Sequence, residues 1–415
     1  MLKSGPYTRI DNISFLCGLF PNEMRDSIER KSKGNIQYAA DALQWSIVKG
    51  LDLYFDSIQL INLPYIGSYP FRYKDAYFKN FHFSHTKGAD DINVGFNNIT
   101  LYKFFSRYIN AKKYLRIWSN NCQHNKLILI YAVHTPFIKA AIEIKEQYNN
   151  VKICLIVPDL PKFMCGNNNI LYKIMRKYQD YLLKQYLNKI DAFVLLSKHM
   201  VEPLRIGSRP WICVEGIYDN KLITYNQSDK PLNKKIILYS GMITSRYGIL
   251  NLMDAFSMIE DENYSLWICG DGDGDAKDEI KRRMNSDSRI KYYGQVPREK
   301  VLSLQKQATV LINPRTSEGE FTKYSFPSKI MEYFASGTPT IMHRLPGIPE
   351  EYFNYCFVAD REDAKGLYDT IKTACGMNQA DLEDVGRKAQ NFILENKNIK
   401  NQACKIFEMI KNLYY

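Results

Sequence analysis

The sequence lacks the features that define several broad classes of protein. Its 415 residues contain no apolar run of the length that crosses a bilayer. The best N-terminal candidate, Ile13 to Phe20, is interrupted by Gly18 and follows charged residues, which predicts a first strand and not a signal peptide. No short repeat or low-complexity tract is present. Because 45% of the residues are hydrophobic and 24% are charged, the composition excludes a disordered or collagen-like chain.

Paired cysteine motifs are also missing. Nine cysteines are scattered along the chain without any Cys-x-x-Cys pair, and several lie within apolar runs. An odd number without paired spacing predicts reduced, buried thiols in a cytoplasmic protein. No histidine, cysteine and acidic residues have the spacing of metal ligands, and no serine–histidine–acid arrangement is evident. The sequence therefore predicts neither a metal site nor a bound cofactor.

Acidic residues are scarce in the first half of the chain only. Residues 1–230 carry 31 Lys and Arg against 19 Asp and Glu, whereas residues 231–415 carry 25 of each. The net charge of +12 therefore belongs to one half. A nucleic acid, an anionic membrane face or a phosphorylated substrate would each explain such a basic half.

The sequence does contain strands and helices that alternate, and the alternation occurs twice. In the first half the predicted strands are Ile13–Leu19, Ser57–Leu63, Lys126–Tyr131, Lys152–Val157 and Ala192–Leu196. The predicted helices between them are Ile36–Lys49, Pro136–Gln147 and Ile170–Leu187. Strands that are apolar almost throughout are typical of a parallel sheet that helices cover on both faces.

The alternation restarts after a polar stretch, Tyr218 to Lys235. The second set of predicted strands is Ile236–Tyr239, Ser265–Cys269, Ile290–Tyr293, Thr309–Ile312 and Thr340–Met342. We therefore predict an α/β fold of two Rossmann-like domains facing an interdomain cleft, over residues 1–217 and 235–395. Residues 218–234 are the predicted linker, and residues 396–415 a terminal helix that can cross back to the first domain.

One segment of the second half, residues 313–337, has the pattern of a ligand site. Ser325 is a predicted N-cap, Pro327 suits a first turn, and Gly337 a helix end. Ser325, Ser328, Lys329 and Glu332 share the polar side of the predicted helix. The helix dipole disfavours a lysine in the first turn unless an anion is bound there. Since the helix follows a parallel strand, we favour an anion site over a solvated polar face.

The second half resembles the nucleotide-sugar-binding domain of retaining glycosyltransferases of family 4, which have the GT-B fold. In order along the chain, the resemblance is carried by residues 239–249, 266–272, 293–296, 311–315 and 326–339. It covers nearly all of the second half. Residues 326–329 read Phe-Pro-Ser-Lys, as in one subgroup of that family.

The resemblance implies roles for several residues around this helix. Glu332 matches the second of two family glutamates, which binds the nucleotide ribose. Tyr324 occupies the position of the first glutamate, and we expect Glu320 on the same loop to replace it. Family members bring an arginine or lysine to the donor pyrophosphate from the loop after the first strand of this domain. Met242 stands at the usual position of that cation, so Arg246 is the nearest candidate here. With Lys329 it would stabilise the leaving diphosphate.

Glycines at strand ends are expected to let backbone approach the donor closely. Gly241 ends the first strand of the second half, and Gly270 opens a Gly-Asp-Gly turn that an ordinary tight turn would also explain. In the first half Gly18 closes the first strand, and Gly34 precedes the helix predicted from Ile36.

Two polar residues of the first half follow predicted strands. His134 precedes Thr135-Pro136 at a helix start, and the family places a histidine from about this region on the donor sugar. Asp159 lies between two prolines and could orient the acceptor hydroxyl. The alternatives are a structural histidine and an Asx-type turn.

These observations predict transfer of a sugar from a nucleoside-diphosphate sugar, UDP-linked by preference, to a glycan or lipid-linked glycan, with retention. The setting expected is surface polysaccharide, capsule or glycoconjugate synthesis. A nucleotide-sugar epimerase or phosphorylase of the same fold, and a non-enzymatic nucleic-acid binder, remain as alternatives. The nucleic-acid binder is disfavoured because the basic half carries no recognised motif.

A basic, tyrosine-rich segment predicts where the protein contacts a membrane. Leu171 to Lys189 interleaves lysines and an arginine with four tyrosines. Cations near anionic headgroups and tyrosines at the interface favour peripheral contact with an anionic membrane. The predicted location is cytoplasmic, on the inner face of the cell membrane, and the alternative is a solvated basic helix.

Overall fold

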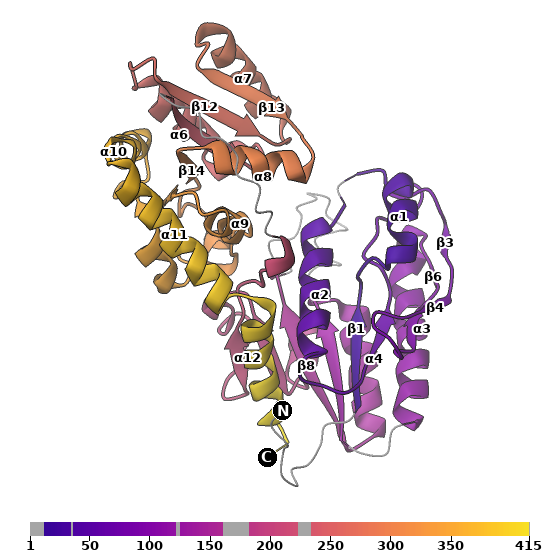
Figure 1. Cartoon of the computed structure of the whole chain (residues 1–415). Helices are drawn as coiled ribbons and strands as arrows, with labels where there is room; N and C mark the ends of the chain where they lie inside the picture. Colours follow the sequence, from indigo (N-terminus) through magenta and orange to yellow (C-terminus); the bar gives the residue numbers. More distant parts are fainter. Residues whose placement is uncertain (1–11, 35, 122–124, 161–181, 223–233, 415) are drawn as a thin grey trace. The chain divides into compact units, whose positions relative to one another are not determined.

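The computed structural model describes residues 12–34, 36–121, 125–160, 182–222 and 234–414. The chain forms two compact units (Figure 1). The first comprises Met1–Ile217 and Ile399–Tyr415, and the second comprises Tyr218–Asn398. Tyr218 belongs to the second unit because its N–H donates to the Lys397 carbonyl at 2.8 Å. Most of the predicted linker, residues 223–233, lies outside the described residues.

The first unit is built on a sheet with strand order β10-β9-β8-β7-β1-β2-β5-β4, parallel except for the antiparallel β4–β5 pair. Its strands are β1 (Asn12–Cys17), β2 (Ile58–Asn62), β4 (Phe81–Phe83), β5 (Asp91–Asn93), β7 (Lys126–Tyr131), β8 (Val151–Val157), β9 (Ala192–Leu195) and β10 (Trp211–Cys213). A small antiparallel pair, β3 (Tyr77–Phe78) and β6 (Phe96–Asn97), lies beside it.

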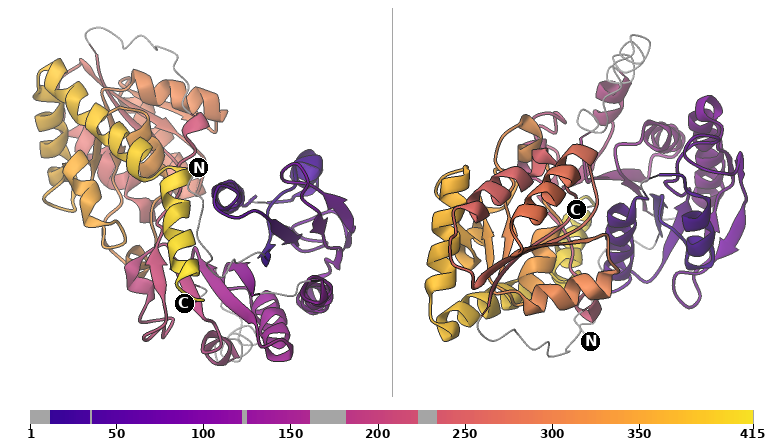
Figure 2. Two further views of the ribbon diagram at one scale, coloured as in Figure 1. Left: turned by 60° about the horizontal axis from the view of Figure 1, so that its bottom comes forward. Right: turned by 90° about the horizontal axis from the view of Figure 1, so that it is seen from above.

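Helices cover both faces of this sheet. They are α1 (Arg25–Lys31), α2 (Tyr38–Leu51), α3 (Thr100–Asn120), α4 (Thr135–Gln147) and α12 (Ile399–Lys411). α2 and α12 pack on one face, where Val48 and Ile406 join the core of Phe15 and Leu129. α3 and α4 pack against each other on the opposite face (Figures 1 and 2). The side chains of β1 and β7 are thus buried on both faces of the sheet. This is why these strands are hydrophobic almost throughout.

The second unit has a six-stranded sheet of order β13-β12-β11-β14-β15-β16, and every pair is parallel. Its strands are β11 (Lys235–Ser240), β12 (Tyr264–Cys269), β13 (Ile290–Gly294), β14 (Val310–Asn313), β15 (Thr340–Met342) and β16 (Phe357–Val358). The strand order reverses between β11 and β14. In parallel α/β sheets, ligands bind at the carboxyl ends of the strands beside such a reversal.

The helices of the second unit are α6 (Ile249–Ser257), α7 (Gly274–Ser286), α8 (Arg298–Gln307), α9 (Lys329–Ala335), α10 (Ala364–Gly376) and α11 (Gln379–Asn396). α6, α7 and α10 bury one face of the sheet, where Phe256 and Ile371 meet Ile268. On the other face, Leu304 of α8 and Tyr333 of α9 join a core with Leu238 and Leu311. Figure 2 shows the two units from two further sides. The predicted α/β class with parallel sheets is confirmed.

Short 3-10 helices complete both units. They are η1 (Asn22–Met24), η3 (Lys198–Met200), η4 (Asn220–Leu222), η5 (Ser245–Tyr247), η6 (Glu320–Tyr324) and η7 (Glu350–Tyr355).

Two predicted helix starts are wrong. The helix placed at Ile36 begins at Tyr38, so Gly34 does not open it. The helix expected to be capped by Ser325 begins at Lys329, and Ser325 instead ends the 3-10 helix η6. Phe326 and Pro327, both buried, lie between the two helices.

Candidate active site

The site of the second unit lies where β11 ends, beside the strand reversal. The Tyr333 phenol of α9 ties the helix to this strand end, since its oxygen accepts from the Ser240 N–H at 2.8 Å and donates to the Ser240 carbonyl at 2.9 Å. Both groups are buried. α9 is therefore fixed against the end of β11, and the fixing places Lys329 beside Gly241.

Lys329 extends its ammonium group over the end of β11. Nζ lies 4.0 Å from the centroid of the Tyr239 ring, and a Cβ on Gly241 would be 3.0 Å from Nζ. The atom is buried, and among the described residues it has no hydrogen-bond partner. Burial, with the charge of Arg315 as a smaller cause, lowers the pKa of Lys329 to about 7. The alternative of a solvated lysine is therefore excluded.

Arg315 is a second buried cation at the same strand ends. Its side chain follows β14 and is 6% exposed. One guanidinium nitrogen donates to Ser325 Oγ at 2.8 Å, and the group lies 4.4 Å from the Phe321 ring centroid. Nε has no partner within the described part of the chain. Burial lowers the pKa of Arg315 to about 10, so the group stays charged at neutral pH.

Arg246 brings a third cation from η5. Its guanidinium carbon lies 3.4 Å from the centroid of the Phe321 ring, so this one ring contacts the guanidinium groups of both Arg246 and Arg315. Arg246 is exposed, unlike the other two. The structure thus brings together the predicted Lys329 and Arg246. It adds Arg315, which the sequence prediction missed although the residue lies in the motif 311–315.

No carboxylate among the described residues forms an ion pair with these three cations. Two buried cations without a counter-ion are costly, because each loses its hydration without gaining a negatively charged partner. An anion bound between them would remove that cost. We refer to Arg246, Arg315 and Lys329 as the cation cluster.

Glu332 is held on both of its oxygens. Oε1 accepts from Gln305 Nε2 at 2.9 Å, and Oε2 accepts from Arg298 at 3.2 Å. Gln305 Nε2 also lies 3.3 Å from Ser240 Oγ, so Glu332 is linked to the same strand end as Lys329. These partners come from α8 and could not be identified from the spacing of the motif.

The loop before α9 carries the remaining predicted residues of this site. Glu320 is exposed, and the Tyr324 hydroxyl lies 3.4 Å from its Oε1. Ser325 Oγ accepts from Arg315 and donates to the Phe321 carbonyl at 3.0 Å, so it supports the cation cluster. Ser328 precedes α9 but makes no side-chain capping bond.

Gly241 and Gly270 are required by close packing of the strand-end loops. A Cβ on Gly270 would lie 1.8 Å from the Gly241 carbonyl oxygen, and φ is +139° at Gly270 and +146° at Gly241. The N–H of Gly241 donates to the Cys269 carbonyl, and that of Gly270 to the Gly294 carbonyl. Both amides are used internally. The glycines therefore provide space for the backbone, and their amides are not free donors for a ligand.

The first unit contains the remaining four predicted site residues, which are Gly18, Gly34, His134 and Asp159. The Gly18 N–H donates to Gln44 Oε1 at 2.8 Å, and a Cβ there would overlap the Tyr65 ring. Gly34 and Asp159 are exposed, and nothing lies within 4 Å of a Cβ on Gly34. Gly18 is therefore a packing residue whose amide is already bonded.

His134 lies in an aromatic and cationic environment at the start of α4. Phe137 and Phe104 have ring centroids 4.4 Å and 5.9 Å from it. Burial, together with Arg107 and Lys103, holds the pKa of His134 well below its usual value, so the ring is neutral. Its Nδ1 is buried without a hydrogen-bond partner in the described chain. A neutral imidazole of this kind can donate to or accept from a sugar hydroxyl.

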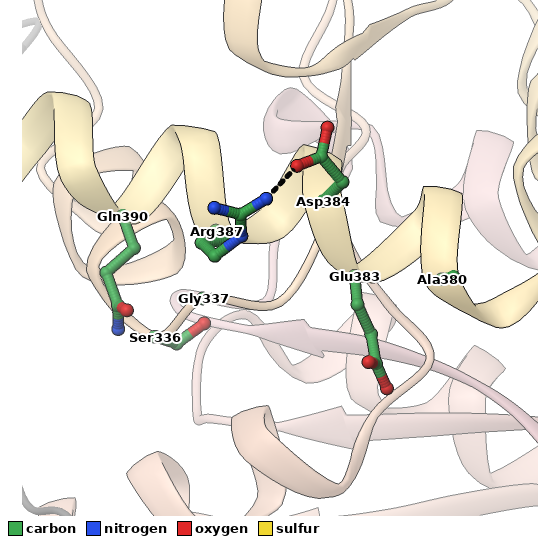
Figure 3. A pocket seen from close by; sticks show the side chains of 7 residues that line it. All are labelled: Ser336, Gly337, Ala380, Glu383, Asp384, Arg387 and Gln390. Atoms are coloured by element: carbon green, nitrogen blue, oxygen red, sulfur yellow. Dashed lines mark hydrogen bonds and ion pairs between the residues drawn. The ribbon is translucent and has the colours of Figure 1, made fainter.

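A separate hollow lies at the other end of α9 (Figure 3). It is lined by Ser336, Gly337, Ala380, Glu383, Asp384, Arg387 and Gln390. Arg387 pairs with Asp384, and Gln390 donates to the Ala335 carbonyl at 2.8 Å. With its one cation already neutralised, the hollow does not suit a phosphate.

The described part of the chain has neither a grouped set of metal-ligand side chains nor a helix suited to span a membrane. Across those residues, no three or more His, Cys, Asp or Glu side chains are grouped so as to hold a metal ion. Cys17, Cys154, Cys269 and Cys375 are buried thiols. None of the described helices is long and apolar enough to cross a membrane.

Comparison with known families identifies the class of the second unit. Residues 234–376 match the family described as glycosyl transferases group 1. The matched residues lie within the second unit and include all three members of the cation cluster. Over these residues the second unit is thus similar to the glycosyl transferases of group 1.

Individual relatives agree with this class. A segment of 52 residues is 46% identical to a protein named as the colanic acid biosynthesis glycosyl transferase WcaI of Escherichia coli (strain K12); it covers 12% of this chain and 13% of that relative. Sucrose-phosphate synthase from Thermosynechococcus elongatus is similar in fold over 97% of this chain and 99% of its own, with a TM-score of 0.64 and 15% identity. HepE from Anabaena, solved with UDP, is similar in fold over 97% of this chain and 100% of its own, with a TM-score of 0.61 and 11% identity. The fold of the chain is therefore that of the GT-B glycosyltransferases.

Proposed function

We propose that the protein is a hexosyltransferase that moves a sugar from a nucleoside-diphosphate sugar to an acceptor hydroxyl with retention of configuration. The observation that carries this proposal is the pair of buried, unpaired cations, Lys329 and Arg315, at the strand ends of a glycosyltransferase domain. A diphosphate supplies the negative charge that both lack. The UDP and UDP-glucose bound by HepE support a UDP-linked donor.

The cation cluster would act mainly on the leaving group. When the glycosidic bond to the donor breaks, negative charge builds up on the departing diphosphate. Cations already fixed in a water-poor site stabilise that charge without reorganising. Lys329 and Arg315 are buried before the donor arrives, and the exposed Arg246 can close over the diphosphate from η5. This chemistry needs no metal ion or other cofactor, and we propose none.

Glu332 and Glu320 have different proposed tasks. Glu332 would accept from the ribose hydroxyls, and its bonds to Arg298 and Gln305 hold the carboxylate in one orientation. Glu320 would supply, from the exposed loop, the carboxylate that Tyr324 lacks. In the first unit, His134 and Asp159 would contact the sugar and acceptor hydroxyls.

The acceptor we propose is a glycan or lipid-linked glycan of surface polysaccharide, capsule or glycoconjugate synthesis, at the cytoplasmic face of an anionic membrane. The name of the short matched relative, WcaI, supports a polysaccharide role. The segment first expected to touch the membrane, Leu171 to Lys189, falls mainly on residues 171–181, which lie outside the described residues. That contact stays a prediction.

Nucleotide binding and sugar transfer test the proposal separately. Thermal-shift measurements with UDP, GDP, dTDP and CMP should show stabilisation by one nucleoside diphosphate, since a ligand of the native state raises the melting temperature. Arg315→Met should reduce that shift, whereas Lys281→Met, which removes a surface cation on α7, should retain it in full. Incubation with the matching nucleotide sugar should release nucleoside diphosphate, which an epimerase would not do. No shift with any of the four nucleotides would contradict the proposal.

A further inference from the structure

The first unit exposes a set of large apolar side chains on α3. Tyr102 and Phe105 are each 63% exposed, and Ile109 is 44% exposed. Their spacing of three and four residues places them along one side of the helix. Exposed aromatic side chains in such a row are unusual on a free surface and indicate a partner.

A neighbouring loop extends this surface. Phe71 is 81% exposed, and Tyr77 at the start of β3 is 59% exposed. The loop is held against the start of α3, because Tyr69 pairs with Ile99 and the Thr100 hydroxyl donates to the Tyr69 carbonyl. The aromatic face is defined as Phe71, Tyr77, Tyr102, Phe105 and Ile109.

The surroundings of the aromatic face are strongly basic. Residues 67–120 contain nine Lys and Arg but only three Asp and Glu, a net charge of +6 that is half of the charge of the chain. Each of the three acids is already paired: Asp75 with Lys31, Asp90 with His82 and Asp91 with His85. Six of the nine cations are exposed, so positive charge remains on the surface of this segment.

The exposed cations lie on the same two segments as the aromatic face. Arg72 and Lys79 belong to the loop, and Lys113 and Arg116 lie further along α3, which contains no acidic residue. On the packed helix α4, Glu143 is engaged by Lys112 at 2.5 Å and by Tyr108 at 2.7 Å. This carboxylate of α4 is therefore already engaged by partners of its own.

We propose that the aromatic face docks onto an anionic lipid bilayer. Tyrosine and phenylalanine would insert at the headgroup level, while Arg72, Lys79, Lys113 and Arg116 would contact anionic headgroups. A protein partner that matched this surface would have to supply both an apolar groove and excess acid, whereas an anionic bilayer supplies both along its whole surface. The inference uses residues of the first unit and does not depend on the donor site.

Docking through α3 has a consequence for the acceptor. The same helix carries Phe104, which is 51% exposed and stacks on the His134 ring, and the cations Lys103 and Arg107, whose charges act on the same imidazole. One helix therefore connects the aromatic face to the predicted acceptor-side histidine. An acceptor sugar whose lipid remains in the bilayer would be presented close to that histidine.

Sedimentation of the full chain with vesicles tests the docking. The protein should pellet with vesicles of phosphatidylcholine mixed with phosphatidylglycerol, and little with phosphatidylcholine alone. Replacing both cations (Lys113→Gln with Arg116→Gln) should lower the partition coefficient roughly 25-fold, because each is worth about a factor of five. Replacing three apolar side chains (Tyr102→Ser, Phe105→Ser, Ile109→Ser) should lower it about tenfold or more.

A matched variant on the second unit controls for general loss of charge and apolar surface. Met258 and Lys291 are both exposed there, and Met258→Ser with Lys291→Gln should leave vesicle binding unchanged. UDP binding should be unchanged in every α3 variant, which separates failure of the docking from failure of the proposed transferase. Equal pelleting with neutral and anionic vesicles, or full binding by the α3 variants, would overturn the proposal. A concentration-dependent dimer that the Tyr102→Ser, Phe105→Ser, Ile109→Ser variant loses would also overturn it, by assigning the face to a second copy of the chain.

Discussion

At the scale of single residues, Lys329 links the stability of the free protein to pH. Its folded-state pKa of about 7 lies below its ordinary value of 10.5, so between these values the unfolded chain binds more protons than the folded one. The free energy of unfolding should therefore rise as pH increases from about 7 toward 10, and Lys329 contributes its full penalty below pH 7. We expect Lys329→Met to flatten this rise and to raise stability at neutral pH, as measured by urea denaturation across that range.

The same residue should couple nucleotide binding to proton uptake. A diphosphate next to Lys329 favours the charged ammonium and raises its pKa. At pH 7.5 to 8 the complex should therefore take up a fraction of a proton, which calorimetry in buffers of different ionisation enthalpy measures. Arg315→Met should weaken binding but keep some uptake, whereas Lys329→Met should remove the uptake. An uptake that is unchanged in Lys329→Met would assign it to another group.

Glu320 and Tyr324 allow a direct test of the missing carboxylate. A phenol is neutral at pH 7 and cannot replace an anionic acceptor. Glu320→Gln should reduce sugar transfer while leaving UDP binding intact, because the sugar and not the nucleotide is affected. Tyr324→Phe is the matched control, since it removes the hydroxyl that lies 3.4 Å from Glu320 Oε1 but leaves the carboxylate. Transfer at the wild-type rate by Glu320→Gln would show that other groups hold the sugar.

At the scale of elements, the bond from Tyr333 to β11 should determine the position of α9. Tyr333→Phe leaves the Ser240 N–H and carbonyl, both buried, without the phenol, which should cost about 1–3 kcal/mol of the free energy of unfolding. Because Lys329 is on the same helix, UDP affinity should fall as well. Tyr355→Phe is the control, since Tyr355 stacks on Phe392 through its ring. Unchanged stability in Tyr333→Phe would mean that packing alone fixes the helix.

Prediction of the elements from sequence succeeded where a single physical signal dominated. Apolar strands such as Lys126–Tyr131 indicated the parallel sheets, because burial on both faces leaves no room for polar residues. The start of α9 was wrong because Ser325 has the chemistry of an N-cap, yet its hydroxyl is engaged by Arg315 and Phe321. Arg315 itself was missed, because its importance arises only when Phe321 and Lys329 fold around it. Contacts of this kind between distant segments leave no pattern in the local sequence.

At the scale of the whole molecule, the charge difference between the two halves corresponds to a difference in surface. The basic half contains the aromatic face, whereas the cation cluster of the second unit is a small, mostly buried group within a balanced half. Raising the salt concentration should therefore weaken vesicle binding more than UDP binding, because long-range attraction to a charged surface is screened over about 10 Å at 0.1 M salt. Parallel measurements of both equilibria over one salt series would reveal the difference.

The last helix of the chain completes the core of the first unit. α12 follows the second unit in sequence, yet Ile406, Met409 and Ile410 are buried in the first unit's core with α2. Removing residues 399–415 should expose this core and destabilise the first unit by several kcal/mol, at about 1.5–3 kcal/mol for each large apolar side chain. The second unit keeps its own sheet and core, so UDP should still bind to it. UDP should raise the melting temperature of the second unit, while the melting temperature of the truncated first unit falls. If the truncated chain loses UDP binding and first-unit stability together, the two units do not fold as separate cores.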